Sequence, residues 1–145
     1  MVDSSSALAP DARRAERLEL RVPTTPTQLP AVRAMAGDLA MRMDYDLDSV
    51  EDLRLAVDEA CATLVDAADP TSQLLCRFLV RPERIRVHAQ VQSAKPDTVL
   101  STDTFGWRVL QTLADEVEVL HEPGSAGRPA TVGIRLDKTA GDVPR

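Results

Sequence analysis

The residues of this sequence that could do chemistry lie on one predicted helix. Glu59 falls outside the apolar stripe of that helix, and Thr63 follows it one helical turn later. A carboxylate next to a hydroxyl could ligate Mg²⁺, which prefers hard oxygen ligands, or could accept a proton from an attacking hydroxyl group. The alternative is structural, because Asp52, Glu59 and Asp66 share this face as a solvated acidic surface would. The spacing alone leaves both interpretations open.

The charge of the chain limits the partners that it could bind. The sequence has 145 residues, a formal net charge of −6 and a pI near 4.9. An acidic protein repels the phosphates of nucleic acids, and no block of Lys or Arg offsets that repulsion here. We therefore expect no direct binding to DNA or RNA, and a protein partner of basic or mixed charge.

The sequence shows no membrane anchor and no metal-binding motif. No apolar run reaches the roughly 20 residues of a membrane span, and the N-terminus lacks the apolar core of a signal peptide. Cys61 and Cys76 lie among apolar residues, which predicts reduced thiols in the core. His88 and His121 have no partner at metal-ligand or catalytic-triad spacing. We expect a cytoplasmic protein without a metal site of its own.

Eight predicted elements would position these residues. Alternation of apolar and polar residues predicts strands, and apolar residues at three- and four-residue spacing predict helices. The predicted order is a strand at 17–23, helices at 28–43 and 48–69, strands at 72–82 and 84–92, a helix carrying apolar residues from Phe105 to Val117, and strands at 116–122 and 130–138. Thr27, Asp48 and Asp103 are the predicted N-caps of the three helices.

This order of elements favours one domain with two layers. Hairpins between consecutive strands predict a mixed, mostly antiparallel sheet with helices on one face, which is a two-layer α/β sandwich. The predicted domain spans residues 16–138, and its length is enough for one hydrophobic core. Residues 1–15 and 139–145 are rich in small, polar and charged residues and are predicted to be disordered tails.

Two segments within these elements resemble a known family. Residues 52–63 read DLRLAVDEACAT and follow the pattern D-L-(K/R)-x-A-V-x-E-A-C-x-N at every fixed position but the last, where Thr63 stands in place of Asn, and residues 112–117 read TLADEV and match T-L-x-D-E-V. Both patterns, and the order of elements across 17–137, resemble the RsbW/SpoIIAB-type anti-sigma factors, which are serine kinases of the histidine-kinase-like ATPase superfamily. The resemblance implies the histidine-kinase-like ATPase (Bergerat) fold.

The resemblance also implies a function and its partners. It implies a homodimer that sequesters an alternative sigma factor of the stress-response or sporulation type. An unphosphorylated anti-anti-sigma factor would release the sigma factor by competing for the same protein. Arg33 matches the family arginine that contacts both partners, a role that suits a planar guanidinium able to bind carboxylates. The alternative for Arg33 is an ordinary exposed arginine.

The nucleotide motifs of the family are incomplete in this sequence. Glu59 matches the catalytic base, but Thr63 replaces the Mg²⁺-binding asparagine. Asp97 lacks the glycines of the D-x-G-x-G box, and the long lid is reduced to a short loop in which only Gly106 resembles a lid glycine. Phosphoryl transfer depends on positioning and on charge neutralisation, so we expect most kinase activity to be lost.

The resemblance therefore leaves Glu59 as a vestigial base and gives Thr63, Asp97 and Gly106 as the candidate cofactor-binding residues. ATP and Mg²⁺ are cofactors implied by the family alone. The alternative function is an active kinase that uses ATP to phosphorylate the anti-anti-sigma factor on serine.

Overall fold

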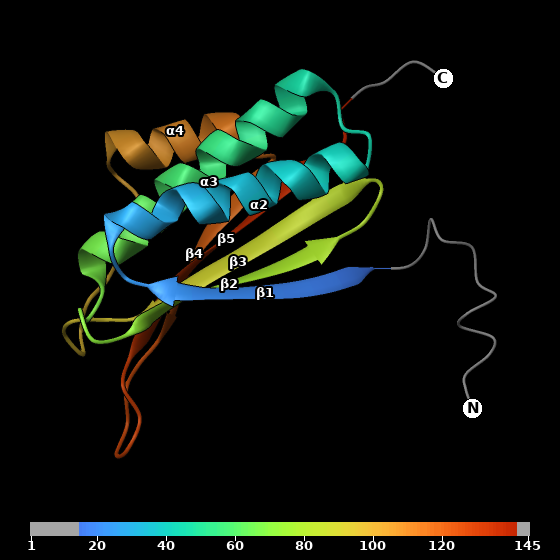
Figure 1. Cartoon of the computed structure of the whole chain (residues 1–145). Coiled ribbons are helices and arrows are strands. Elements are labelled where there is room, and N and C mark those ends of the chain that lie inside the picture. Colours follow the sequence, from blue (N-terminus) through green and yellow to red (C-terminus); the bar gives the residue numbers. More distant parts are fainter. Residues whose placement is uncertain (1–14, 142–145) are drawn as a thin grey trace, which may run out of the picture.

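The sheet of this protein is antiparallel throughout and has helices on one face only (Figure 1). The computed structural model describes residues 15–141. Its elements are β1 (Glu16–Pro23), the 3-10 helix η2 (Pro26–Gln28), α2 (Leu29–Arg42), α3 (Leu47–Ala67), β2 (Gln73–Val80), β3 (Arg84–Gln92), α4 (Phe105–Leu113), β4 (Glu116–Glu122) and β5 (Thr131–Thr139). The strand order is β1-β2-β3-β5-β4. The predicted two-layer α/β sandwich is confirmed, and every pairing between these five strands is antiparallel.

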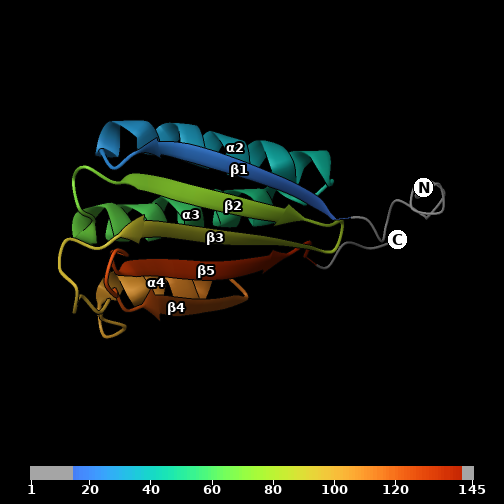
Figure 2. The ribbon, with the colours of Figure 1, turned by 90° about the horizontal axis from the view of Figure 1, so that it is seen from below.

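The alternation of the strands separates a buried face from an open one. In β3, Ile85, Val87 and Ala89 point toward the helices and are buried, whereas the residues between them point away and are half-buried. Seen from below in Figure 2, the strands lie in front of all three α-helices, so no helix covers this second face. The core therefore lies between the sheet and the helices.

Two helices begin at residues other than the predicted caps. Thr27 lies inside η2, and Gln28 is the residue that precedes α2. Asp46 caps α3, because its Oδ1 accepts a hydrogen bond of 2.7 Å from the backbone N–H of Ser49. The predicted cap Asp48 is in the first turn of that helix. Neighbouring short polar side chains offer the same acceptor, so the sequence pattern could not choose between them.

The third α-helix starts one residue later and ends earlier than predicted. Its cap is Thr104, whose Oγ1 accepts a hydrogen bond of 3.1 Å from the backbone N–H of Trp107, and not Asp103. Val117 lies in β4 rather than in the helix. Phe105, the first of the apolar residues predicted for this helix, is 81% exposed at the first turn. The apolar pattern therefore continued past the C-terminal end of α4 and included an exposed residue of its first turn.

The two cysteines lie in the core, as predicted. The Sγ atoms of Cys61 in α3 and Cys76 in β2 are 3.9 Å apart, and both residues are buried. The contact with Cys76 and burial raise the pKa of the Cys61 thiol. Both features favour the protonated thiol.

The ends of the chain lie largely outside the described residues. The predicted tails at 1–15 and 139–145 overlap them only at residue 15 and at 139–141, and β5 continues to Thr139. No helix within residues 15–141 combines the length and the apolar character needed to cross a lipid bilayer.

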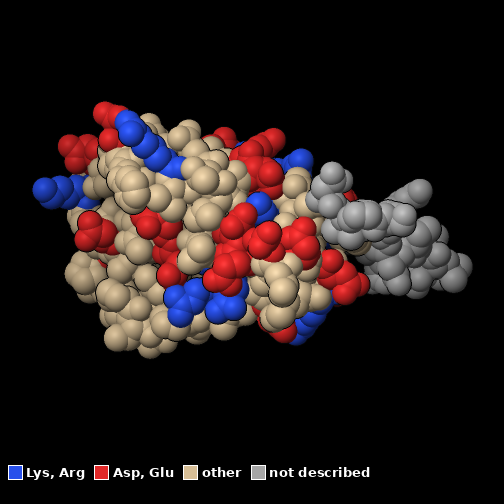
Figure 3. Space-filling model, turned by 90° about the horizontal axis from the view of Figure 1, so that it is seen from above, with Lys and Arg blue, Asp and Glu red and all other residues tan. Residues whose placement is uncertain are grey.

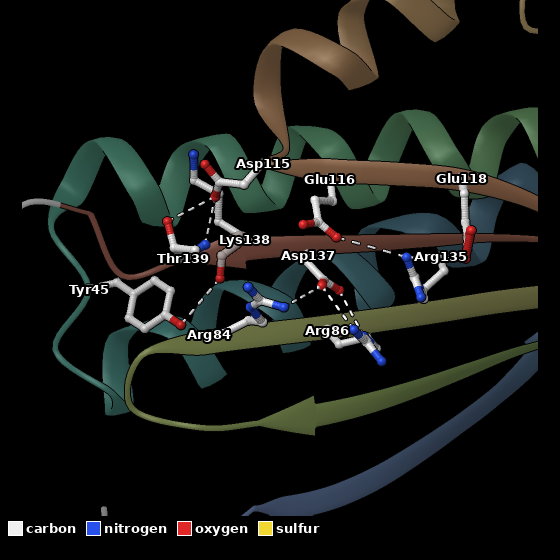
Figure 4. A network of polar contacts seen from close by, with 10 residues as sticks. All are labelled: Tyr45, Arg84, Arg86, Asp115, Glu116, Glu118, Arg135, Asp137, Lys138 and Thr139. Atoms are coloured by element: carbon white, nitrogen blue, oxygen red, sulfur yellow. Dashed lines mark hydrogen bonds and ion pairs between the residues drawn. The ribbon is translucent and has the colours of Figure 1, made fainter.

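A buried carboxylate joins β5 to β3 on the open face (Figure 4). Oδ1 of Asp137 accepts a hydrogen bond of 2.9 Å from Nε of Arg86. Oδ2 accepts two more of 3.1 Å, one from Nη2 of Arg86 and one from Nη1 of Arg84. The Asp137 side chain is 1% exposed, whereas the arginines remain 41% and 37% exposed. The two guanidinium groups therefore cover the carboxylate.

The end of β5 is anchored in the same region (Figure 4). Oδ2 of Asp115 accepts hydrogen bonds from the backbone N–H of Thr139 at 2.7 Å and from its hydroxyl at 3.0 Å. The hydroxyl of buried Tyr45 donates to the backbone carbonyl of Lys138 at 3.4 Å. Burial raises the pKa of Tyr45 well above its usual range. The aspartate of the TLADEV segment thus has a structural role at the end of β5.

A row of charged residues crosses the centre of the open face. It runs over five adjacent strands through Glu19, Arg77, His88, Arg135 and Glu118. Arg77 pairs with Glu19 at 3.2 Å, and Arg135 pairs with Glu118 at 3.1 Å. His88 therefore lies between two arginines, and partial burial followed by these charges lowers its pKa.

We expect His88 to make the fold less stable in mild acid. An unfolded histidine protonates near pH 6.5. In the folded protein, burial and the charges of Arg77 and Arg135 disfavour the protonated form of His88, and the opposite effect of Glu122 is weaker. The unfolded state then binds more protons than the folded state. The contribution of neutral His88 to the free energy of unfolding is therefore complete above about pH 6.5 and is lost as the pH falls toward the pKa of the folded state. Urea denaturation at pH 7.5 and 5.5 should show a smaller decline for His88→Gln than for wild type, with exposed His121→Gln as control. Equal declines would contradict the expectation.

Candidate nucleotide and partner sites

Glu59, Thr63 and Gly106 come together where α3 meets α4. The hydroxyl of Thr63 donates to the backbone carbonyl of Glu59 at 2.9 Å and lies 3.4 Å from its carboxylate oxygen Oε2. The same Oε2 lies against Gly106, so closely that a β-carbon at position 106 would collide with it. The structure thus brings together three of the four residues that the sequence proposed for a nucleotide pocket.

The position of Gly106 explains why the carboxylate can lie there. Gly106 is in the first turn of α4, directly after the Thr104 cap and Phe105. The N-terminal turn of a helix carries a partial positive charge, which favours a nearby carboxylate. Only a residue without a side chain leaves room for Glu59 at this point. The contact therefore fixes α4 against α3 by both shape and charge.

Asp97, the fourth candidate, is not part of this group. It is exposed in the loop between β3 and α4. Within residues 15–141 its carboxylate makes no hydrogen bond or ion pair that would hold it toward Glu59. The sequence placed Asp97 by its likeness to the D-x-G-x-G box, and the structure supplies no contact that supports this role.

The residues present do not fit a complex of ATP and Mg²⁺. The carboxylate of Glu59 takes the space next to Gly106, and the hydroxyl of Thr63 is already bonded to the backbone of Glu59. In this structure the carboxylate of Glu59 is in contact with Gly106 and Thr63.

Gly106→Ala should reverse its effect when Glu59 is removed. In wild type we expect a loss of about 1 kcal/mol, because the new methyl group collides with the carboxylate and the flexible Glu59 side chain must move away from the helix. In a Glu59→Ala background the collision is absent, and alanine should stabilise the helix by up to about 1 kcal/mol relative to glycine. Urea denaturation of the four proteins in this cycle measures both effects. Equal effects of Gly106→Ala in the two backgrounds would show that the contact does not form.

Arg33 lies on the helix-covered face and is already paired within the chain. Its Nη1 is 3.1 Å from Oδ2 of Asp58 in α3, and each of the two side chains is 34% exposed. No other nitrogen of this guanidinium has a hydrogen bond within residues 15–141. Arg33 thus keeps an accessible edge, while Asp58 limits where the guanidinium can point. The sequence proposed Arg33 as a partner residue and gave no sign of Asp58.

A second contact between α2 and α3 was also absent from the sequence analysis. Gly37 of α2 faces Arg54 of α3, and a β-carbon at position 37 would be 2.8 Å from Cδ of Arg54. A glycine inside a helix costs up to about 1 kcal/mol relative to alanine, so its presence within α2 was a signal of close packing. The sequence did not identify Arg54 as the residue that faces Gly37, because that depends on how α2 and α3 pack against each other.

The helix-covered face is predominantly acidic. Figure 3 looks down on this face and shows a broad band of acidic side chains with smaller groups of basic ones among them. Arg33 and Arg54 belong to this face because they lie on α2 and α3. Such a surface favours a partner of basic or mixed charge.

Comparison with known proteins agrees with this fold. Residues 22–131 match a family model described as the histidine kinase-like ATPase domain. The chain is 36% identical over 141 residues to the anti-sigma-F factor RsbW of Mycobacterium tuberculosis, which covers 94% of this chain and 81% of that protein. It is 31% identical over 130 residues to the serine-protein kinase RsbW of Bacillus subtilis, which covers 76% of this chain and 81% of that protein.

A solved structure shows the same architecture. The crystal structure of the RsbU and RsbW domains of a Mycobacterium tuberculosis protein aligns with a TM-score of 0.60 at 15% identity. The alignment covers 90% of this chain but only 34% of that longer chain, so it supports the fold alone. The family match and the two relatives lead to one conclusion. This chain belongs to the histidine kinase-like ATPase family and, within it, to the RsbW group.

Proposed function

We propose that this chain is an anti-sigma factor that binds an alternative sigma factor of the stress-response or sporulation type and keeps it from RNA polymerase. The observation that carries the proposal is the 36% identity, along 94% of the chain, to a protein named anti-sigma-F factor. The charge of the helix-covered face is compatible with a protein partner of mixed charge. The binding would occur in the cytoplasm, where RNA polymerase acts.

Release of the sigma factor would follow from competition. In this proposal an anti-anti-sigma factor binds the same helix-covered face, and both partners contact Arg33. The accessible edge of the Arg33 guanidinium can bind one carboxylate at a time, because Asp58 already holds Nη1. Binding of one partner would then exclude the other.

The contacts of Glu59 favour sequestration without phosphoryl transfer. The Bacillus subtilis relative is named a serine-protein kinase, and Glu59 and Thr63 are adjacent in this chain, so an active kinase is the alternative. We propose that it is not the main activity, because Glu59 lies against Gly106 and Thr63 is bonded to the backbone. Incubation with ATP, Mg²⁺ and the anti-anti-sigma factor should leave the mass of that factor unchanged. A mass increase of one phosphate group would establish the kinase.

The function is tested by capture followed by affinity measurement. A tagged protein is used to isolate partners from the source cell, and mass spectrometry should identify an alternative sigma factor. Arg33→Glu should weaken binding of the purified sigma factor and of the anti-anti-sigma factor by about tenfold or more. Glu59→Ala, the control, should change neither affinity by more than about twofold. Failure to recover any sigma factor, with other proteins recovered, would contradict the function.

We also propose a homodimer formed through the free edge of β1. β1 is an edge strand of the sheet, and its outer backbone groups are available for another strand. In an antiparallel pair of two β1 strands with Leu20 opposite itself, Glu19 lies opposite Arg21 of the partner subunit, and Leu18 lies opposite the partner's Val22. Moving the register by one residue in each strand would place Glu19 opposite its own copy. Charge therefore favours the first register.

Two charge reversals test this dimer. Glu19→Arg alone would place arginines opposite each other, and Arg21→Glu alone would place glutamates opposite each other, so each variant should be monomeric in sedimentation equilibrium. An equal mixture of the two restores opposite charges at both contacts and should form a heterodimer. Because Glu19 also pairs with Arg77, thermal melts are needed to confirm that both variants are folded. Variants that dimerise alone as strongly as wild type would exclude this interface.

A further inference from the structure

The surface between α2 and α3 contains a second arginine that the proposed function does not use. The two helices are antiparallel neighbours, so moving four residues forward along α2 corresponds to moving four residues back along α3 (Figure 1). Arg33 faces Asp58, and one turn further Gly37 faces Arg54. We call these four residues the α2–α3 seam.

Gly37 makes room for the stem of Arg54. A β-carbon at position 37 would be 2.8 Å from Cδ of Arg54, which is closer than real β-carbons approach another atom, and 3.0 Å from Cγ, which is a tight contact. Gly37 is buried, whereas the Arg54 side chain is 39% exposed. The stem of Arg54 therefore lies across α2, and its guanidinium remains at the surface of the seam.

Contacts among residues 15–141 do not account for the charge of Arg54. Its Nε is buried and has no hydrogen-bond partner among the described residues. Its nearest carboxylate is Glu51, at 3.9 Å from Nη1, and both side chains are exposed enough for water to weaken that pair. A buried donor without a partner costs free energy, so packing alone would favour an apolar residue here.

The spacing of the two arginines defines the ligand. Arg54 lies opposite Gly37, which is four residues beyond Arg33 in α2, so the two arginines are offset by about 6 Å along the helix axes at 1.5 Å per residue. Two carboxylates at positions i and i+4 of an α-helix are separated by the same rise. We infer that Arg54 is a second docking residue, and that the seam binds a partner helix that carries two carboxylates one helical turn apart.

The surroundings of the seam add two requirements for that helix. Glu51 and Asp58 lie next to the arginines, so a uniformly acidic helix would be repelled and basic residues must flank the two carboxylates. Met41 and Leu55 are 53% and 44% exposed on the same two helices and offer apolar contacts. The partner segment is therefore an amphipathic helix of mixed charge, bound in the manner of a helix in a groove.

A synthetic helix tests the spacing directly. The probe is an alanine-rich helical peptide with two glutamates at i and i+4 and lysines on either side, and its control has the same composition with the glutamates at i and i+2. NMR titration of the full chain should show at least about threefold tighter binding of the first peptide, with shifts in α2 and α3. The preference should disappear in Arg54→Ala. Equal binding of the two peptides would overturn the inference.

The sigma factor recovered in the capture experiment gives the second test, because the inference rests on the proposed function. Arg54→Ala should weaken its binding by about tenfold, and Arg42→Ala, an exposed arginine of α2 paired with Asp38 at 2.8 Å, by less than about twofold. Gly37→Ala should weaken binding in wild type, because the methyl group displaces the Arg54 stem, but should have no further effect in Arg54→Ala. Melting temperatures confirm that each variant is folded.

The outcomes separate the two proposals. If Arg33→Glu weakens sigma binding and Arg54→Ala does not, the second docking residue is wrong and the anti-sigma function stands. If no sigma factor is recovered but the spaced peptide binds through Arg54, the seam is supported and the function is wrong. If Gly37→Ala weakens binding equally with and without Arg54, the effect comes from helix packing and the inference is wrong.

Discussion

Phe78→Ala is expected to lower the free energy of unfolding by about 4 kcal/mol, the largest effect of any single change considered for this chain. Phe78 is 1% exposed in β2 and is among the largest fully buried side chains. Its truncation removes apolar contacts and leaves a cavity that a close-packed core fills only in part. Urea denaturation monitored by circular dichroism measures the loss.

The second phenylalanine of the chain is the matched control. Phe105 is 81% exposed at the start of α4, so Phe105→Ala should change the stability by no more than about 0.5 kcal/mol. The two variants remove the same atoms from two environments. A comparable loss in both would mean that Phe105 is buried in solution, for example against a second copy of the chain.

Asp137→Ala is expected to cost about 3 kcal/mol. The change removes three hydrogen bonds and leaves the guanidinium groups of Arg84 and Arg86 next to each other without a counter-charge. Removing one partner of a buried ion pair typically costs 3–5 kcal/mol, and the partial exposure of both arginines places this case at the lower end.

An exposed ion pair on the same face provides the comparison for Asp137. Glu118 pairs with Arg135 at 3.1 Å, and its side chain is 46% exposed. Glu118→Ala should cost less than about 1 kcal/mol, because water screens the pair and replaces the lost contact. Similar losses for the two variants in urea denaturation would show that the burial of Asp137 contributes nothing beyond an ordinary surface pair.

Most of the architecture followed from local periodicity. The alternation of β3 predicted both its length and its buried face, because Ile85, Val87 and Ala89 are the residues that point to the helices. The ends of the helices did not follow from the sequence. Asp103 and Thr104 are both good N-caps, and only the structure shows that Thr104 is the one that accepts a hydrogen bond from a backbone N–H of the first turn. Phe105 fits the apolar pattern but precedes the buried part of α4.

The contacts that define the candidate sites needed the tertiary structure. The closeness of Glu59 and Thr63 to each other follows from helical spacing alone. The contact of Glu59 with Gly106 depends on how α4 packs against α3. The alternation of β5 places Asp137 on the open face, where an acidic residue is expected to be solvated. Its burial depends on the register that places Arg86 directly across from it.

Likeness to a family predicted the role of Arg33 but not its surroundings. A sequence pattern records which residue stands at a position, and the pairing of Arg33 with Asp58 depends on the alignment of two antiparallel helices. The same alignment places Gly37 opposite Arg54. Both contacts join residues that are distant in sequence, and no periodicity within one helix reveals them.

The position of β5 has a consequence for how the protein is made. β5 is the last strand within residues 15–141, yet it lies between β3 and β4 rather than at an edge (Figure 2). While the ribosome still holds the C-terminal residues, β4 has no neighbour to pair with and β3 lacks one of its two. A nascent chain that stops at residue 130 would lose an interior strand and leave two strands open to aggregation. Pairing of β5 with both of its neighbours is therefore the step that closes the sheet.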